Sequence, residues 1–238
     1  MRCPPGRSVG LKISLGKTKM MKMKNKSNAK TKVQGEELEE VEHFKYLGSY
    51  ISVDSNIEKE VSTRIGMGAQ AFNKLQNIWK SSSLTTKTKL KIYRSNVRSV
   101  LLYAAETWRT NKKIESRLRG FEGRCLRRIL RIRWQDHVTN EEVRRRTGIN
   151  NINDEVKRRR WSWLGHALRM NKSRLPHAAL RWAPPGKRKR GRPMGTWRRT
   201  VEEEMKGKTW NELGWMAQDR NAWKRHVGAL CSARSPED

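Results

Sequence analysis

Apolar side chains recur every three or four residues from about residue 57 onward, and this spacing predicts a succession of amphipathic helices. The first three expected helices cover residues 57–80, 85–108 and 111–132. A serine run at 81–83 separates the first two, and Thr85 or Thr86 is suited to cap the second. The residues expected to face the core are Ile65, Ala69, Phe72, Leu75, Trp79, Leu90, Tyr93, Val97, Val100, Leu101, Ala104, Trp108, Ile114, Leu118, Phe121, Cys125, Ile129 and Ile132.

Helical spacing continues through the rest of the chain. Thr139, with Glu142 three residues later, is a capping-box start for a short helix that ends near Gly148. A longer helix is expected from about residue 153 to 170. Residues 181–199 are rich in Lys, Arg, Pro and Gly and contain no acid, which is typical of a flexible basic linker. Further helices are expected at 196–206, 209–214 and 217–230.

The segment before residue 57 has a different period. Apolar and polar positions alternate over residues 38–53, with Gly48 in the middle, which favours a β-hairpin or a bent strand. Residues 17–32 are rich in Lys and are expected to be extended or loose. The fold class predicted from these patterns is mainly α, a helical bundle followed by distal helices, with a small β-hairpin near the N-terminus.

The net charge of the chain indicates the kind of partner it binds. The chain has 54 Lys and Arg against 23 Asp and Glu, a formal net charge of +31. Self-repulsion of that size favours a polyanionic partner, and counterion release from RNA or DNA supplies the affinity. A membrane partner would require a basic helix with a clean apolar face or a lipid anchor, and neither is found. The 10 Trp and 35% hydrophobic content indicate a folded body rather than a disordered basic tail.

Catalytic and metal-binding patterns are absent from the sequence. Cys3, Cys125 and Cys231 are widely spaced and favour neither a disulfide framework nor a zinc site, which is typical of an intracellular protein, nuclear or cytoplasmic. His166 has no partners at ligand spacing and is expected to be packed or capping. No nucleophile motif, P-loop or pair of adjacent aspartates occurs. We therefore expect no catalytic residues, metal, cofactor or small-molecule substrate on this chain.

Arginines recur on successive expected helices. They would form a stripe that follows a phosphate backbone, because acids are scarce in these segments. The alternative is that they pair with glutamates on the surface. Trp134, Trp161 and Trp163 lie among them and can either stack on unpaired bases or, the favoured interpretation, pack in the core. The candidate contacts are Arg127, Arg128, Arg131, Arg133, Arg144, Arg145, Arg146, Lys157, Arg158, Arg159 and Arg160.

The basic linker is a second candidate. Its centre, Arg190-Gly191-Arg192-Pro193, resembles an AT-hook, an extended segment that inserts arginines into the minor groove of A·T-rich DNA. A nuclear-import sequence or a plain solvated linker are the alternatives. The candidate residues here are Lys187, Arg188, Lys189, Arg190 and Arg192.

Six short stretches in a consistent order resemble the C-terminal part of a non-LTR (LINE-like) retrotransposon endonuclease–reverse transcriptase. These are GLKIS at 10–14 followed by KTK at 17–19, FKYLGSYI at 44–51, LLYAAETW at 101–108, NEEV at 140–143, RRWSWLGH at 159–166 and KRGRP at 189–193 with Trp197. Ser14 stands where the family usually has Asn. The resemblance spans about residues 9 to 230.

The resemblance implies a division of the chain. Residues 1–55 would be the end of the polymerase palm with a primer-grip-like hairpin, 56–134 a thumb-like helical bundle, 135–180 a basic helical region, 181–199 the AT-hook-like linker and 200–238 the C-terminal helices. In the hairpin the implied grip residues are Phe44, Tyr46, Leu47 and Gly48. Lys17 matches a lysine that assists pyrophosphate departure in the family, and Lys19 is a further candidate nucleic-acid contact.

The resemblance also implies what the chain lacks. The family holds Mg²⁺ with aspartates in a YADD-type hairpin, which this sequence does not contain. We therefore expect a non-catalytic part of an RNA-directed DNA polymerase that binds primer–template or element RNA, with the apolar face of its N-terminal hairpin exposed. The alternatives are an independent basic DNA-binding or chromatin-associated protein that uses the AT-hook-like segment, and a basic structural or ribosome-associated protein.

Overall fold

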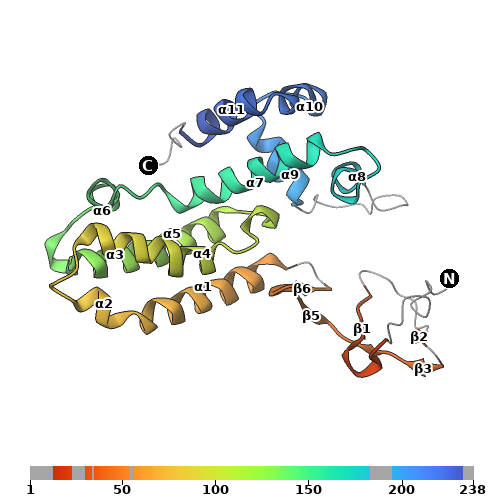
Figure 1. The fold of residues 1–238 in the computed structure, drawn as a ribbon, viewed down its shortest axis with the longest axis horizontal. Helices are drawn as coiled ribbons and strands as arrows, with labels where there is room; N and C mark the ends of the chain where they lie inside the picture. Colours follow the sequence, from red (N-terminus) through yellow and green to blue (C-terminus); the bar gives the residue numbers. More distant parts are fainter. Residues whose placement is uncertain (1–12, 23–29, 34, 54–55, 183–194, 233–238) are drawn as a thin grey trace. The chain divides into compact units, whose positions relative to one another are not determined.

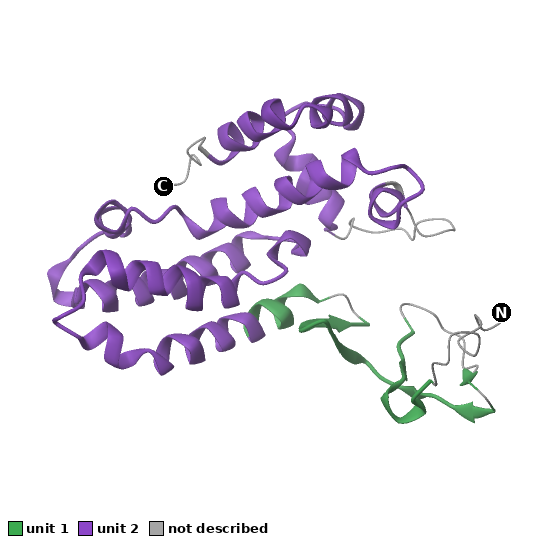
Figure 2. Cartoon of the chain, in the orientation of Figure 1, with its two compact units in different colours: residues 1–62 green, residues 63–238 purple. Residues whose placement is uncertain are grey.

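The computed structural model describes residues 13–22, 30–33, 35–53, 56–182 and 195–232. The described chain is mainly α-helical with small two-stranded sheets, which confirms the predicted fold class. It separates into two compact units, residues 1–62 and 63–238 (Figure 2). Each unit is considered by itself below.

The described part of the first unit contains short strands in pairs. A 3₁₀ turn, η2 (Leu15–Lys17), precedes them. The strand β1 (Lys19–Met20) pairs in parallel with β4 (Glu39–Glu40), β2 (Lys32–Val33) pairs antiparallel with β3 (Glu36–Glu37), and β5 (His43–Tyr46) forms an antiparallel hairpin with β6 (Ser49–Ser52). Each of the first two pairs is accompanied by Lys–Glu ion pairs, Lys19 with Glu39 and Lys30 with Glu37. The lysine-rich segment is therefore partly ordered by the acids that follow it.

The hairpin expected around Gly48 is confirmed, with the glycine in its turn. Leu47 and Gly48 both have positive φ, 48° and 82°, as a two-residue type I′ turn requires, and Tyr46 pairs directly with Ser49. The hairpin is fastened to the first turn of the next helix by the buried Glu60. Its carboxylate accepts hydrogen bonds from the Ser49 hydroxyl at 3.0 Å and from the Tyr50 N–H at 2.7 Å.

The helices expected at 57–80, 85–108 and 111–132 are present, but the first two are divided. They are α1 (Ile57–Lys74), α2 (Gln76–Lys80), α3 (Thr86–Ile92), a π-helical segment η3 (Tyr93–Arg98), α4 (Ser99–Leu101), a 3₁₀ turn η4 (Ala105–Thr107) and α5 (Lys112–Leu130) (Figure 1). Thr85 caps α3 through a hydrogen bond from the Thr88 N–H, as one of the two expected candidates.

The break between α1 and α2 has a side-chain cause. The Trp79 indole N–H donates to the Phe72 carbonyl at 2.7 Å, an acceptor that an uninterrupted helix would give to a backbone N–H. The two rings stack, with their centroids 4.9 Å apart. Stacking and the indole hydrogen bond together compensate for the interrupted helix, and both residues are buried as expected.

The distal helices follow the expected order. They are η5 (Trp134–Asp136), α6 (Asn140–Thr147), α7 (Ile152–Arg169), α8 (Leu175–Arg181), α9 (Trp197–Glu204), α10 (Trp210–Gln218) and α11 (Arg220–Ser232). Only α8 has no counterpart among the expected helices. Thr139, Thr196 and Thr209 cap α6, α9 and α10 with their hydroxyls, which explains why these boundaries were predictable.

The core of the second unit has α7 at its centre. One side of α7 packs against α5 and η4, and the other against α10 and α11 (Figure 1). The distal core combines buried residues from α7 to α11: Trp161, Leu164, Ala167, Leu180, Val201, Met205, Leu213, Ala217, Trp223, Val227, Leu230 and Cys231. Among the described helices, none has the length and apolar character needed to cross a membrane.

A glycine on α7 lets α11 approach closely. The Trp223 indole lies directly over Gly165 and donates its N–H to the Trp161 carbonyl at 3.0 Å. A Cβ at Gly165 would overlap the Trp223 ring. Position 165 therefore requires glycine, because the packing of α11 leaves no room for a side chain there.

Gly165→Ala is expected to destabilise the protein by about 1–3 kcal/mol, because the added methyl group overpacks the contact with Trp223. Urea unfolding followed by circular dichroism measures the change. The matched control is Gly214→Ala on α10, where a Cβ meets nothing within 4 Å and the better helix propensity of alanine should stabilise by up to about 1 kcal/mol. Equal effects of the two substitutions would contradict the packing explanation.

Candidate nucleic-acid interface

The C-terminal half of α5 exposes arginines and no acid. Arg119, Arg124, Arg128 and Arg131 are exposed at intervals of three to five residues, whereas Glu122 is buried and Glu115, four residues before Arg119, is half-buried. Between residues 123 and 135 the chain contains basic residues but no Asp or Glu. Arg119, Arg124 and Arg128 form no ion pair within the described part of the chain. Their positive charges are therefore not compensated by neighbouring carboxylates.

Two cations meet at the C-terminal end of α2, beside the end of α5. The buried Lys89 ammonium donates to the Trp79 carbonyl at 3.0 Å and to the Ser81 carbonyl at 2.6 Å. The Arg131 guanidinium donates to the Lys80 carbonyl at 2.7 Å. Unpaired carbonyls at a helix C-terminus are natural acceptors for such groups. Burial, and then the Arg131 charge, lower the pKa of Lys89.

Arg127 and Arg128 differ in their contacts although they are neighbours. Arg127 is half-buried and donates to the Val138 carbonyl at 3.1 Å, which fixes the segment that leads into α6. Arg128 is exposed, and its guanidinium lies 5.9 Å from the centre of the Phe72 ring. Of the two, Arg128 presents the more accessible charge.

Trp134 is the aromatic residue whose placement differs most from expectation. Core packing is confirmed for Trp161, which is fully buried, and Trp163 packs against the same core while partly exposed. For Trp134 the expectation was wrong: its side chain is 80% exposed. It lies in η5, directly after Arg133, at the end of the arginine-rich helix.

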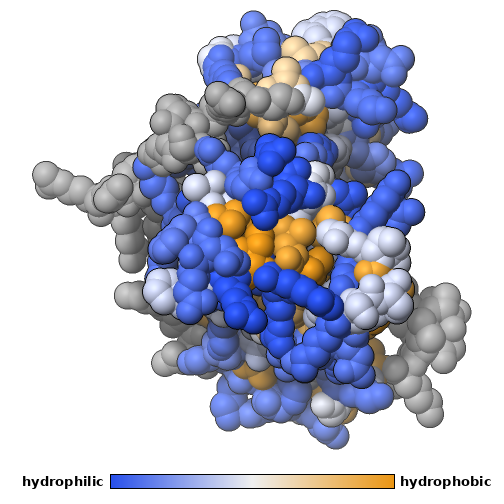
Figure 3. All heavy atoms as spheres, turned by 90° about the vertical axis from the view of Figure 1, so that its left-hand side faces the viewer, coloured by the Kyte–Doolittle hydropathy of each residue, from blue (hydrophilic) through white to orange (hydrophobic). Residues whose placement is uncertain are grey.

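Figure 3 faces the end of the second unit at which α2, α3 and α6 lie in Figure 1. Hydrophilic residues surround a central apolar area at this end, and further apolar residues are visible above it (Figure 3). The exposed Lys80, Lys87 and Arg131 belong to the elements that meet here. The end is thus a polar surface to which several cations contribute.

The arginines of α6 were expected to lack acidic partners, but two of them are paired with a glutamate. Glu142 accepts hydrogen bonds from Arg145 at 2.6 and 2.7 Å and from Arg146 at 2.7 Å. These bonds lower the pKa of Glu142 to about 2. The surface-pairing alternative therefore describes Arg145 and Arg146 better than a free phosphate-binding row does. Arg144 is half-buried and lines a pocket between α5 and α6.

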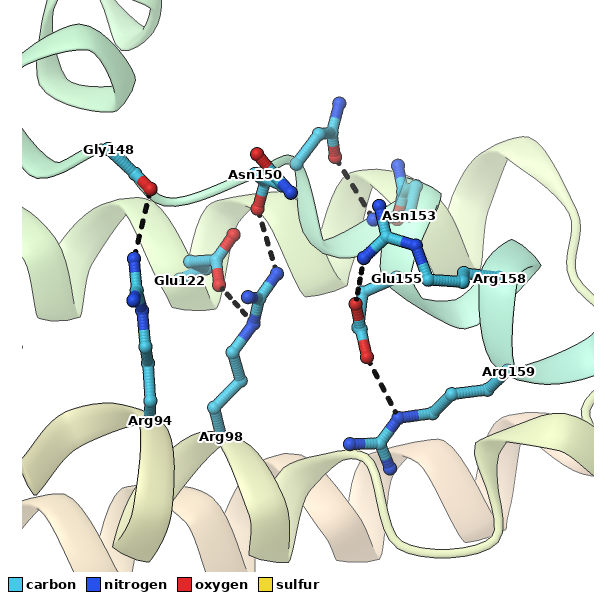
Figure 4. A network of polar contacts seen from close by, with 10 residues as sticks. Arg94, Arg98, Glu122, Gly148, Asn150, Asn153, Glu155, Arg158 and Arg159 are labelled. Atoms are coloured by element: carbon cyan, nitrogen blue, oxygen red, sulfur yellow. Dashed lines mark hydrogen bonds and ion pairs between the residues drawn. The ribbon is translucent and has the colours of Figure 1, made fainter. Parts of the chain in front are cut away.

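The arginines at the start of α7 are also paired with a glutamate. Glu155 pairs with Arg158 at 2.7 Å and with Arg159 at 3.2 Å (Figure 4). Arg159 also donates to the Leu102 carbonyl at 2.7 Å, which ties α7 to the chain after α4. Both arginines and Lys157 are half-buried. Arg159 therefore helps to hold α7 in place, whereas the ion pair of Arg158 lies within its own helix.

Arg160 is not on the surface at all, so its expected membership in a basic stripe was wrong. Its side chain is 1% exposed and forms an ion pair with Glu204 of α9. It also donates to the Trp108 carbonyl and to the Thr110 hydroxyl, each at 3.0 Å. The other Glu204 oxygen accepts the Trp161 indole N–H at 2.7 Å. A buried guanidinium requires such partners, because an unpaired charge in the interior is very costly.

Glu204→Ala is expected to destabilise the protein by about 3–5 kcal/mol, since it leaves the buried Arg160 charge without its acid. Equilibrium unfolding in urea measures the loss. Glu203→Ala removes the neighbouring exposed carboxylate and should stay within about 0.5 kcal/mol of the unsubstituted protein. A loss below about 1 kcal/mol for Glu204→Ala would show that the pair is not needed for stability.

A second buried acid joins α5 to the elements around it. Glu122 lies 3.1 Å from Arg98 of the π-helical segment, and Arg98 donates to the Asn150 carbonyl at 2.8 Å (Figure 4). Arg94 reaches the Gly148 carbonyl at 2.9 Å. The π-helical segment thus carries two arginines that hold the connection from α6 to α7. Helical periodicity alone does not indicate that Arg94 and Arg98 bind this connection.

Glu122 also lines a pocket of about 300 Å³ together with Arg119, Gly123, Leu126, Asn140, Glu141, Val143, Arg144 and Asn151. Burial raises the pKa of Glu122 to about 7, although Arg98 opposes the shift. The folded protein therefore keeps a proton on Glu122 up to near-neutral pH. In the unfolded chain this proton leaves near the ordinary value of 4.5.

Because the folded-state pKa of Glu122 is raised, its contribution to stability is present below pH 4.5 and is lost as the pH rises to about 7. Glu122→Gln mimics the protonated acid and removes this dependence. We expect Glu122→Gln to raise the melting temperature above that of the unsubstituted protein at pH 8 and to leave it nearly unchanged at pH 5. Scanning calorimetry at both pH values measures this, and an equal difference at the two would contradict it.

The remaining candidates lie in the first unit or outside the described residues. Lys17 is exposed at the end of η2, and Lys19 is half-buried in its pair with Glu39. In the hairpin Tyr46 is 56% and Leu47 74% exposed, which confirms the expected exposed apolar face. Phe44 is half-buried and Gly48 is in the turn. Lys187, Arg188, Lys189, Arg190 and Arg192 lie outside the described residues.

The described cysteines and His166 are not arranged as a functional site. Cys125 and Cys231 are free and buried, and burial raises the pKa of Cys125 to about 12, in keeping with a core residue. His166 is exposed in the last turn of α7 rather than packed, where the carbonyl end of the helix favours a basic group. Within the residues that the structure describes, no three His, Cys, Asp or Glu side chains are grouped to hold a metal ion.

Comparison with known proteins places the chain near transposon-derived sequences. It is 26% identical over 230 residues to a protein of Caenorhabditis elegans described as transposon-derived and uncharacterised, covering 90% of this chain and 82% of that protein. A family described as a domain of unknown function (DUF6451) matches residues 71–103, from the end of α1 to Tyr103. No solved structure matches the chain. The chain is thus similar over nearly its full length to a protein of transposon origin.

Proposed function

We propose that this chain is the C-terminal, thumb-bearing part of a retrotransposon reverse transcriptase and that it binds nucleic acid, either primer–template or element RNA. The observation that carries the proposal is the row of exposed arginines from Arg119 to Arg133, a range in which the single acid, Glu122, is buried. The resemblance of six ordered stretches to this class of enzyme supports it. So does the similarity to a transposon-derived protein over 90% of the chain.

The chemistry of binding follows from the charge distribution. Arginines on α6 and α7 are occupied by Glu142 and Glu155, whereas Arg119, Arg124 and Arg128 on α5 have no carboxylate partner in the described chain. Guanidinium groups bind phosphate oxygens and release condensed counterions. Under this proposal α5 provides the phosphate contacts, and the linker residues 187–192 extend them.

Under the same proposal the chain does not polymerise DNA by itself. The family's YADD-type hairpin, which binds Mg²⁺, has no counterpart in the sequence. The part proposed here therefore contributes affinity and positioning to an intact enzyme, in the nucleus or the cytoplasm. Polymerase activity of the isolated chain on a primed template would contradict this part of the proposal.

The binding test uses a triple variant of α5, Arg119→Gln, Arg124→Gln and Arg128→Gln. We expect its affinity for an RNA–DNA hybrid to fall about 10- to 100-fold, and the slope of log K against log salt to become shallower by about one for each lost phosphate contact. Fluorescence anisotropy of a labelled hybrid between 50 and 200 mM salt measures both quantities.

The matched control removes the same charge elsewhere. Arg220→Gln, Lys224→Gln and Arg225→Gln change three exposed residues of α11 and should reduce affinity far less. Equal losses in the two triple variants would mean that net charge, not the α5 face, supports binding. Absence of binding to any nucleic acid at low salt would refute the proposed function, and binding confined to A·T-rich duplex DNA would favour the DNA-binding alternative.

A further inference from the structure

We propose that Trp134 is a stacking platform for an unpaired base, so that the α5 end of the chain binds a single-stranded segment of nucleic acid. This inference rests on the proposed nucleic-acid binding and specifies the form of the ligand at that surface. Trp182 is also exposed and directly follows Arg181, but of the exposed aromatic residues described only Trp134 has three arginines within the six residues before it. Three features support the inference: the exposure of Trp134, the rigidity of its turn and the charge around it.

The exposure of Trp134 is unusual for so large an apolar side chain. It is 80% exposed, whereas Trp79, Trp108 and Trp161 are among the largest fully buried side chains of the protein. His137 forms a T-shaped pair with it, with ring centroids 6.2 Å apart. Because Trp134 is 80% exposed despite this contact, the indole remains accessible to a ligand.

The turn that carries Trp134 is fixed at both ends. Arg131 ends α5 in the left-handed conformation, with φ of 59°, and its guanidinium is bound to the Lys80 carbonyl. Within the turn the Arg133 N–H donates to the Asp136 carboxylate at 2.7 Å. After the turn the Val138 carbonyl accepts from Arg127 at 3.1 Å. Trp134 is therefore held outward by a built turn, and a ligand does not have to order a loose loop.

The surroundings of Trp134 select a negatively charged ligand. Arg128, Arg131 and Arg133 precede it within six residues, and Lys80 is exposed beside the Arg131 contact. Asp136, the acid of the same turn, accepts a hydrogen bond from the Arg133 N–H and offsets only part of this positive charge. An apolar groove of a partner protein would leave these cations without counterions. A nucleotide supplies both complements, a flat base for the indole and phosphates for the guanidinium groups.

The ligand must be single-stranded at this point. In a duplex each base is stacked on both faces, so an indole meets a free base only at an unpaired nucleotide or an overhang. Stacking of one base on an aromatic side chain contributes about 1–3 kcal/mol. At about 1.4 kcal/mol for each factor of ten, its loss corresponds to an affinity change of roughly 5- to 140-fold.

The test compares three labelled ligands of equal length by fluorescence anisotropy at constant salt: a blunt RNA–DNA hybrid, the same hybrid with a single-stranded overhang, and a single strand. Trp134→Ala should weaken binding to the overhang and the single strand about 10-fold and leave the blunt hybrid unchanged. The salt slope should stay the same, because stacking releases no counterions. Trp134→Phe should restore most of the affinity, since it keeps an aromatic face.

The matched control is Trp215→Ala on α10. Trp215 is 81% exposed, as much as Trp134, but its helix contains no Lys or Arg, so the substitution should change no affinity. Equal losses for all three ligands in Trp134→Ala, or the same loss in Trp215→Ala, would overturn the stacking inference while leaving the proposed function intact. If the unsubstituted chain bound none of the ligands, the proposed function itself would fail.

Discussion

The fold of the second unit depends on one buried charge, the guanidinium of Arg160. It lies on α7 and is neutralised by Glu204, which comes 44 residues later on α9. The same guanidinium binds the Trp108 carbonyl and the Thr110 hydroxyl ahead of α5. Because a buried cation requires all of its partners, α7, α9 and the chain before α5 can assemble in few alternative ways. The tryptophan packing of α7 against α11 builds on this arrangement, since Glu204 also holds the Trp161 indole.

That constraint divides the arginines of the chain into two groups with different tasks. On α6 and α7 they are paired with Glu142, Glu155 or Glu204, and Arg159 and Arg160 also bind carbonyls outside α7. On α5 the exposed Arg119, Arg124 and Arg128 form no ion pair within the described chain. The positive charges of the described arginines are therefore compensated unequally. At 157–160, where the sequence is most basic, Arg160 is buried and Arg158 and Arg159 are paired with Glu155.

The parts of this fold that depend on local chemistry could be predicted from the sequence. Helical spacing, threonine caps such as Thr139 and the Gly48 turn are decided within a few residues. The errors involve side-chain contacts that helical spacing does not encode. The break after Lys74 accompanies an indole hydrogen bond from Trp79 to the Phe72 carbonyl, and the buried Arg160 is paired with an acid on another helix. Tryptophan usually packs in the core, but Trp134 follows the left-handed end of α5 at Arg131 and is exposed.

Under the proposed function, stability and binding use the same cation, Arg131. Its guanidinium closes the end of α2 through the Lys80 carbonyl, yet the residue remains exposed. A hydrogen bond to a neutral carbonyl leaves the positive charge uncompensated, so under this proposal the group that orders the turn also binds phosphate. An ion pair with a carboxylate, as in Arg145 with Glu142, orders a helix but cancels the charge. The choice of carbonyl acceptors at the α5 end, and of carboxylates on α6 and α7, therefore determines where accessible positive charge remains, and the proposed binding to a polyanion depends on that charge.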